Sequence, residues 1–190
     1  SPELFLDVDR RAGTAVTRPI KGTRAFHEDP AELMASAKEA AELHMIVDLM
    51  RNDLSRACEP GSVRVLEARA AEPHATVLHG VAQIHGRLRR DRDLADLIAA
   101  TFPPGSITGA PKVRAMEIIR ELEIAPREVY CGTIGWAAPD GRASFNVAIR
   151  TFRLEGDGTA RLDVGGGIVW DSTPEAEYEE ALWKTRFARI

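Results

Sequence analysis

The sequence has 190 residues, of which 44% are hydrophobic, so it is long enough to bury one substantial core in one or two domains. A formal net charge of −4 without a polybasic run gives no indication of a nucleic-acid or anionic-membrane partner. Two isolated cysteines and the lack of any apolar run near the roughly 18 residues of a membrane span favour a reducing, cytoplasmic location.

The first residues predict a β-hairpin. Residues 4–8 and 14–20 are strand-like and are joined by a polar turn over 9–13. The chain lacks an initiating Met and the basic region of a signal peptide. We therefore expect residues 1–190 to be one catalytic-domain fragment, with the N-terminal part of a longer chain missing.

The segment from Arg18 to Arg24 predicts a constrained cationic turn that presents Lys21. Pro19 fixes φ, and Gly22 permits backbone angles that a β-carbon forbids. A lysine held in this way is a nucleophile when its ammonium loses solvent or lies near other cations, here the two arginines. A solvated surface lysine is the alternative that these seven residues leave open.

Between residues 29 and 123 the sequence predicts a helix, then two strands, then two more helices. Asp29 and Pro30 provide an N-cap and a first-turn proline, and apolar positions then follow the helical period to about Ala57. Beyond this helix the sequence predicts strands over 62–68 and 75–88, the second interrupted by Gly80, and helices over 91–102 and 111–123.

The C-terminal third is β-rich. Three strand-like segments, joined by short glycine-containing turns, cover 129–137, 143–154 and 160–170. A last helix begins at about Pro174, capped by Ser172 or Thr173, and runs to the end of the chain. Loops this short imply antiparallel pairing, so we predict an α+β fold with antiparallel sheets and packed helices.

Two helices carry carboxylates three residues apart, Glu39 with Glu42 and Glu177 with Glu180. This spacing places each pair on one helix face. If the two faces met across a cleft, they would offer Mg²⁺ the oxygen ligands that it prefers. Solvated surface is the alternative for either pair.

Other candidate ligand contacts lie in loops and strands. The run from Gly165 to Gly167, late in a predicted strand, favours close approach of a ligand or another backbone, with a bulge as the alternative. The loop 105–112 offers hydroxyl and N–H groups beside a helix start, as an anion cradle does, but lacks the nucleotide phosphate-loop pattern. Arg150, in a predicted strand, is compatible with an ion pair or a ligand clamp, and His79 with a core or a site role.

Several segments together resemble the chorismate-utilising enzymes in order and spacing. They are Ser1-Pro2-Glu3, Pro19 to Thr23, Met45 to Asp53, Gly105 to Lys112, Tyr130-Cys131-Gly132 and Gly165 to Val169. Within this family the pattern is similar to component I of the aminodeoxychorismate synthases. Component I of the anthranilate synthases usually carries Ala at the position of Lys21. One departure is the sequence His79-Gly80-Val81-Ala82, where the family usually reads His-Leu-Val-Ser.

The resemblance implies amination of chorismate at C4. Lys21 would attack C2 of the ring as the C4 hydroxyl leaves, and ammonia would then add at C4 and expel the lysine. Glu3 would protonate the departing hydroxyl, and His79 would lie close to the reacting ring. A glutamine amidotransferase subunit or domain would supply the ammonia, and the product would serve p-aminobenzoate and folate synthesis.

The resemblance also implies ligand positions. Glu42 and Glu180 match the family's Mg²⁺ ligands, with Glu39 and Glu177 nearby. The substrate-contacting positions are Gly22, Thr23, Ser106, Tyr130, Arg150, Gly165, Gly166, Gly167 and Lys184. Two other functions stay open: an anthranilate synthase component I, and a chorismate-binding domain without catalysis.

Overall fold

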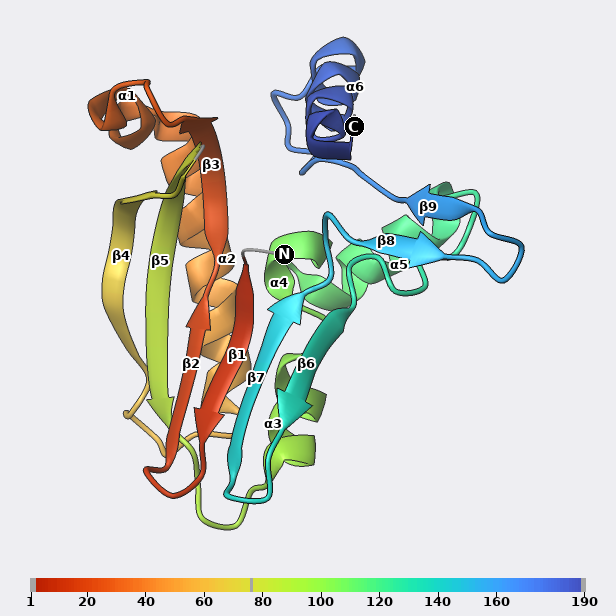
Figure 1. The fold of residues 1–190 in the computed structure, drawn as a ribbon. Helices are drawn as coiled ribbons and strands as arrows, with labels where there is room; N and C mark the ends of the chain where they lie inside the picture. The colour runs from red at the N-terminus through yellow and green to blue at the C-terminus, as the bar shows by residue number, and fades with distance from the viewer. Residues whose placement is uncertain (1–2, 76, 189–190) are drawn as a thin grey trace.

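A seven-stranded sheet organises the chain in the computed structural model, which describes residues 3–75 and 77–188 (Figure 1). Its strands are β1 (Leu4–Asp9), β2 (Thr14–Arg18), β3 (Ile20–Ala25), β4 (Arg64–Pro73), β5 (Val77–Arg87), β6 (Thr133–Ala137) and β7 (Arg142–Val147). A separate hairpin contains β8 (Phe152–Leu154) and β9 (Ala160–Leu162). The strand pairs among the described residues are antiparallel, so the predicted α+β class is confirmed.

The expected cationic turn at residues 18–24 is wrong, because β2 and β3 continue one another along the same side of β5. Thr17 pairs with Ile84 and Ile20 pairs with Val81. Pro19 separates β2 from β3 without reversing the direction of the chain, and its carbonyl accepts a hydrogen bond from Ala82 N at 3.1 Å. Lys21 therefore lies in a strand, next to the register shift between Ile20 and Thr23.

Gly22 and Gly80 explain how the two strands fit at this point. Gly22 has φ of +87°, in the region that favours glycine. A β-carbon on Gly80 would lie 2.4 Å from the carbonyl oxygen of Lys21, so only glycine allows this approach. Strand β5 is thus continuous through Gly80, where the sequence predicted an interruption.

The helices are α1 (Pro30–Ala35), α2 (Ala37–Ser55), α3 (Leu94–Thr101), α4 (Gly105–Thr108), α5 (Lys112–Leu122) and α6 (Pro174–Trp183), followed by a 3-10 turn over Arg186–Ala188. The single helix predicted from Pro30 to Ala57 is wrong: Ser36 is extended, and its hydroxyl accepts from Glu39 N to start α2. The predicted caps Asp29 and Thr173 are confirmed. None of the described helices has both the length and the apolar character needed to cross a membrane.

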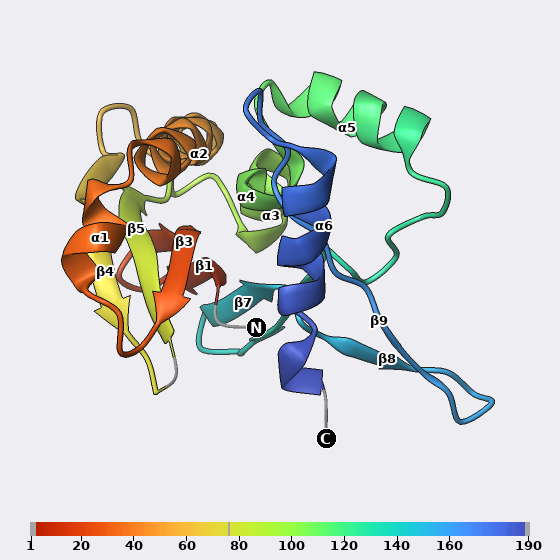
Figure 2. The ribbon, with the colours of Figure 1, turned by 90° about the horizontal axis from the view of Figure 1, so that it is seen from above.

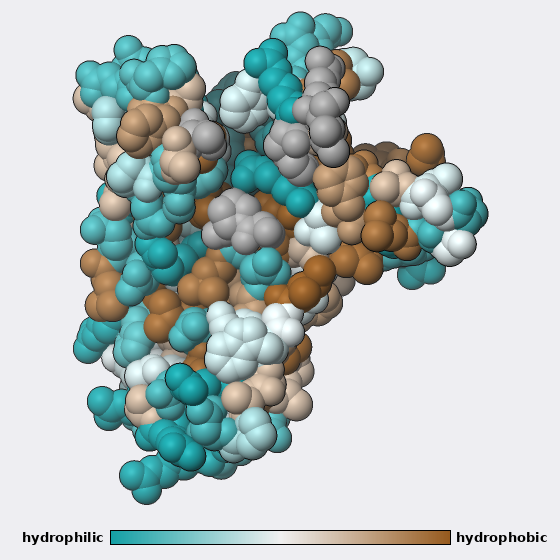
Figure 3. All heavy atoms as spheres, in the orientation of Figure 1, coloured by the Kyte–Doolittle hydropathy of each residue, from teal (hydrophilic) through white to brown (hydrophobic). Residues whose placement is uncertain are grey.

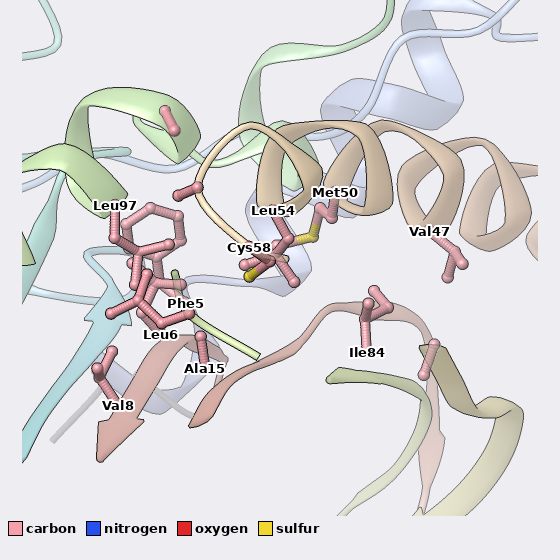
Figure 4. Close-up of a cluster of buried hydrophobic side chains, with 14 of the residues drawn as sticks. Phe5, Leu6, Val8, Ala15, Val47, Met50, Leu54, Cys58, Ile84 and Leu97 are labelled. Atoms are coloured by element: carbon pink, nitrogen blue, oxygen red, sulfur yellow. The ribbon is translucent and has the colours of Figure 1, made fainter. Parts of the chain in front are cut away.

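The core lies between α2 and the sheet and extends under α3. Apolar residues of α2 at helical spacing, Ile46, Val47, Met50 and Leu54, face residues of β1 and β5. Figure 4 shows Val47, Met50 and Leu54 together with Phe5, Leu6, Ile84 and Leu97. Each fully buried aliphatic side chain of this kind contributes about 1.5–3 kcal/mol. The start of β1 and the middle of β5 are therefore held on a packed layer.

The C-terminal half is less buried. The strands predicted over 143–154 and 160–170 are too long, because β7 ends at Val147 and β9 ends at Leu162. Arg150 lies between β7 and β8 with φ of +51°, and residues 165–167 lie in irregular backbone. Helices α5 and α6 contain no buried residue, and hydrophobic side chains reach the surface at β8 and β9 (Figure 3). Helix α6 stands above the sheet, nearer to the end of β7 than to α1 or α2 (Figures 1 and 2).

Candidate active site

Glu3 is a buried carboxylate at the entry to β1. It is 5% exposed, and its backbone carbonyl accepts a hydrogen bond from Val147 N at 3.0 Å. Burial raises its pKa to about 6, although the Ser106 hydroxyl, Lys21 and other nearby groups oppose this. Its Oε1 is buried and has no hydrogen-bond partner among the described residues. Such a carboxyl exchanges its proton near neutral pH and has a free oxygen for a ligand. Ser1 and Pro2, which precede it in the motif, lie outside the described residues.

Lys21 is half-buried and lies beside the glycine run. A β-carbon on Gly167 would lie 3.3 Å from the Nζ atom of Lys21, so the chain passes close to the ammonium. Lys21 is also near enough to Glu3 for its charge to lower the pKa of that carboxyl. The amine and the acid therefore belong to one site, although they come from two different strands.

Residues 165–167, the glycine run beside Lys21, also lie close to Tyr130, Glu177 and Lys184. A β-carbon on Gly165 would lie 3.1 Å from the Tyr130 hydroxyl, and one on Gly166 would lie 2.7 Å from Glu177 Oε2. Lys184 Nζ donates to the Gly165 carbonyl at 2.9 Å. The run thus lies close to side chains of three other segments, outside any strand; the predicted approach of a ligand or another backbone stays a prediction.

His79 is a buried neutral imidazole of β5. It is 2% exposed, and its Nδ1 lies 3.0 Å from the Thr23 hydroxyl. Burial, then the charges of Arg150 and His74, lower its pKa to about 4. The His74 ring lies edge-on at 5.1 Å. At neutral pH His79 therefore donates and accepts hydrogen bonds without a charge.

Arg150 is the cation whose influence reaches both Glu3 and His79. Its charge lowers the pKa of each of them, and burial lowers its own pKa. The prediction that Arg150 lies in a strand is wrong, because its left-handed backbone directs the chain away after β7. It remains beside the acid and the histidine, where an anionic substrate group would neutralise it.

The four predicted carboxylates do not form one cluster. Within residues 3–75 and 77–188, no three His, Cys, Asp or Glu side chains are placed to hold a metal ion together. Glu39 accepts from Arg24 at 2.8 and 3.3 Å, while Glu180 pairs with Lys184 at 2.6 Å. Sequence reasoning missed the Arg24 pair, since 15 residues separate the partners and no periodic pattern links them.

The α6 carboxylates do come together at Gly166. Glu177 Oε2 is buried without a hydrogen-bond partner among the described residues, and Glu180 Oε1 would lie 3.7 Å from a β-carbon on Gly166. Mg²⁺ commonly takes one or two protein carboxylates together with water and substrate oxygens. The carboxylates of Glu177 and Glu180 therefore fit a magnesium ion that a substrate also binds. That the ion is magnesium stays a prediction.

The sequence pattern of the chorismate binding enzymes matches residues 1–189. The chain belongs to this family. Among its relatives, anthranilate synthase component 1 of Streptomyces coelicolor is 46% identical over 98% of this chain and 37% of that protein. Aminodeoxychorismate synthase component 1 of Bacillus subtilis is 47% identical over 97% of this chain and 40% of that protein. The chain thus spans about two fifths of the length of these chorismate binding relatives.

Solved structures of the family share the fold. Anthranilate synthase component I from Streptococcus pneumoniae superposes with a TM-score of 0.89 and 38% identity, over 100% of this chain and 42% of that chain. The menaquinone-specific isochorismate synthase MenF of Escherichia coli superposes with a TM-score of 0.87 and 26% identity, over 100% of this chain and 44% of that chain. Relatives with different reactions therefore share this framework.

Proposed function

We propose that this chain is the chorismate-converting part of an enzyme that aminates chorismate at C4 and forms 4-amino-4-deoxychorismate. A glutamine amidotransferase supplies ammonia in this proposal, and the product leads to p-aminobenzoate and folate in the cytoplasm. The observation that carries it is the pairing of a buried acid, Glu3, with the amine of Lys21 in one site. Relatives that are aminodeoxychorismate synthases, such as that of Bacillus subtilis, add support.

In this mechanism Glu3 and Lys21 share one proton. Glu3, with a pKa of about 6, accepts the proton of the Lys21 ammonium and passes it to the C4 hydroxyl of chorismate. The Lys21 nitrogen forms a bond to C2 while the C4–O bond breaks and water leaves. Ammonia then adds at C4, the C2–N bond breaks, and the electron pair returns to Lys21. Neutral His79 orients the ring without adding charge.

The anionic substrate is held from the opposite side. In this proposal a carboxylate of the substrate binds Arg150, which lies near Glu3 and His79, together with Tyr130 and the backbone at Gly165–Gly167, which lie beside each other. By the family resemblance Glu42 and Glu180 would hold Mg²⁺, with Glu177 beside Glu180 at Gly166, and the bound ion would supply a positive charge for the ring carboxylate.

The test is product analysis of the protein in its natural length with chorismate, ammonium and Mg²⁺. We expect 4-amino-4-deoxychorismate, and we expect Lys21→Ala to lower its formation at least 100-fold because no covalent adduct forms. Lys21→Arg is the matched control, since it keeps the positive charge but cannot act as the nucleophile, and should be as inactive. Undiminished C4 amination by Lys21→Ala would exclude the covalent route, and no turnover of chorismate by the unchanged protein would favour a binding domain.

Anthranilate synthesis is the second candidate, because relatives of equal similarity carry that name. It requires amination at C2 and elimination of pyruvate. Fluorescent anthranilate, formed without an added lyase, would identify this reaction. Lys21 favours C4 amination, since its attack would occupy the C2 carbon.

A further inference from the structure

One ammonium group joins the two ends of the loop that carries Ser106. Lys112 Nζ, at the start of α5, donates to Asp53 Oδ2 at 2.5 Å and to the carbonyl of Thr101 at 2.9 Å. The side chains of Lys112 and Asp53 are only 15% and 7% exposed. Thr101 ends α3, and Asp53 lies near the end of α2. Residues 102–111 therefore leave and return to one buried point.

The loop is packed between that point and Glu3. A β-carbon on Gly105 would lie 2.7 Å from Leu49 Cδ2, so α4 lies directly on α2. The Phe102 ring meets the Phe5 ring of β1 edge-on at 6.3 Å. Ser106, in α4, has a buried hydroxyl without a hydrogen-bond partner among the described residues.

The Ser106 hydroxyl and the Glu3 carboxyl are buried in the same region. The Ser106 hydroxyl lies close enough to Glu3 to lower the pKa of its carboxyl. Glu3 Oε1 has no hydrogen-bond partner among the described residues, and an unsatisfied buried oxygen costs free energy, so a ligand group at this oxygen would complete its hydrogen bonds. Small movements of the loop would separate Ser106 from Glu3.

We propose that Asp53 and Lys112 are a positioning pair that closes the loop 102–111 at its base and so holds Ser106 against Glu3 for the acid step. This inference rests on the proposed function, because it concerns the acid that acts on chorismate. Neither residue touches the place of the reacting ring in this account; they act through the loop.

A purely structural ion pair would behave differently. Buried ion pairs contribute little net stability compared with well-packed apolar side chains, so stability alone does not require this one. A positioning pair changes the environment of Glu3 when it is broken. The pH dependence of turnover therefore distinguishes the two roles, since a structural defect lowers activity equally at every pH.

The experiment compares Lys112→Met, Ser106→Ala and the double variant in the protein of natural length. Lys112→Met keeps the side-chain length and removes the donors. We expect it to lower kcat about tenfold or more and to move the acid limb of the pH–rate profile, near pH 6, to higher pH, since Ser106 no longer lowers the pKa of Glu3. Chorismate consumption is measured, so the identity of the product does not enter.

The double variant provides the decisive comparison. If Lys112 acts through Ser106, the limb shifts no further than in Ser106→Ala alone. An unchanged limb in Lys112→Met, or shifts that add in the double variant, would overturn the proposal. Arg92→Met, which breaks an exposed pair with Asp96 of α3, is the matched control and should leave the limb in place.

Two further measurements keep the test decisive. Should Lys112→Met fail to fold, Asp53→Asn keeps the shape of the side chain and replaces it in the same comparison. Should the unchanged protein not consume chorismate, the proposed function fails, and the Glu3 pKa is then followed by NMR of ¹³C-labelled carboxyls in the unliganded protein. An upward shift in Asp53→Asn supports the positioning role, and an unshifted pKa refutes it.

Discussion

Replacing Glu3 by Gln tests the raised pKa of this carboxyl through protein stability. Burial raises the pKa of this carboxyl from 4.5 to about 6 in the folded chain, so the folded state holds the proton more tightly than the unfolded state does. Each pKa unit corresponds to about 1.4 kcal/mol, so ionised Glu3 destabilises the fold by about 2 kcal/mol. The cost is absent below pH 4.5, grows as the pH rises through 6, and is constant above that.

Glu3→Gln has no such titration. The difference in unfolding free energy between the variant and the unchanged protein should therefore shift by about 2 kcal/mol in favour of the variant between pH 4 and pH 7.5. Urea unfolding at a series of pH values measures it, while the variant should lose at least 100-fold in turnover at pH 7.5. A difference that is independent of pH would show that burial does not raise this pKa, and the acid role would lose its physical basis.

Three other changes probe the rest of the site. Gly166→Ala places a β-carbon 2.7 Å from Glu177 Oε2, so we expect at least a tenfold loss in kcat/KM for chorismate with little change in Tm; wild-type affinity would show that α6 does not border the substrate. The His79 ring signals should not titrate above pH 5 in an NMR pH series, because burial lowers its pKa to about 4, and a midpoint near 6.5 would contradict this. Removal of Mg²⁺ by a chelator should abolish turnover and its return should restore it, with Glu180→Gln raising the Mg²⁺ requirement; full activity in chelator would exclude the metal role.

The sequence predicted correctly those features that depend on neighbouring residues, namely helix caps and the first hairpin. Asp29 and Thr173 cap their helices because a short polar side chain reaches the free N–H groups of the next turn. The β1–β2 hairpin follows from two strand-like segments and a polar turn. The continuation of β2 into β3 was not predictable locally, because it depends on β5 offering a partner on both sides of Pro19.

In the site, too, local motifs predicted some residues, while contacts between distant segments were not predictable. Motifs located Glu3, Lys21 and the glycine run, whose proximity the structure supplies. The partners that hold the site were not predictable, since Lys112 pairs with Asp53 across 59 residues. No periodic pattern in the chain connects residues that far apart; the fold of the segments between them brings the Lys112 side chain, at the start of α5, to Asp53.

The residues around Glu3 and His79 are more tightly packed than the glycine run and α6. Glu3 directly precedes β1 and His79 lies on β5, two strands that pack against the core, and both residues are buried. The glycine run lies in irregular backbone, and α6 contains no buried residue. Fewer packing contacts therefore oppose movement of these two segments. We therefore expect the acid and the neutral histidine to be set before a ligand arrives, and the glycine run and α6 to gain order when the ligand binds. In the proposed function, binding energy spent on that ordering would make turnover depend on both carboxylates of chorismate.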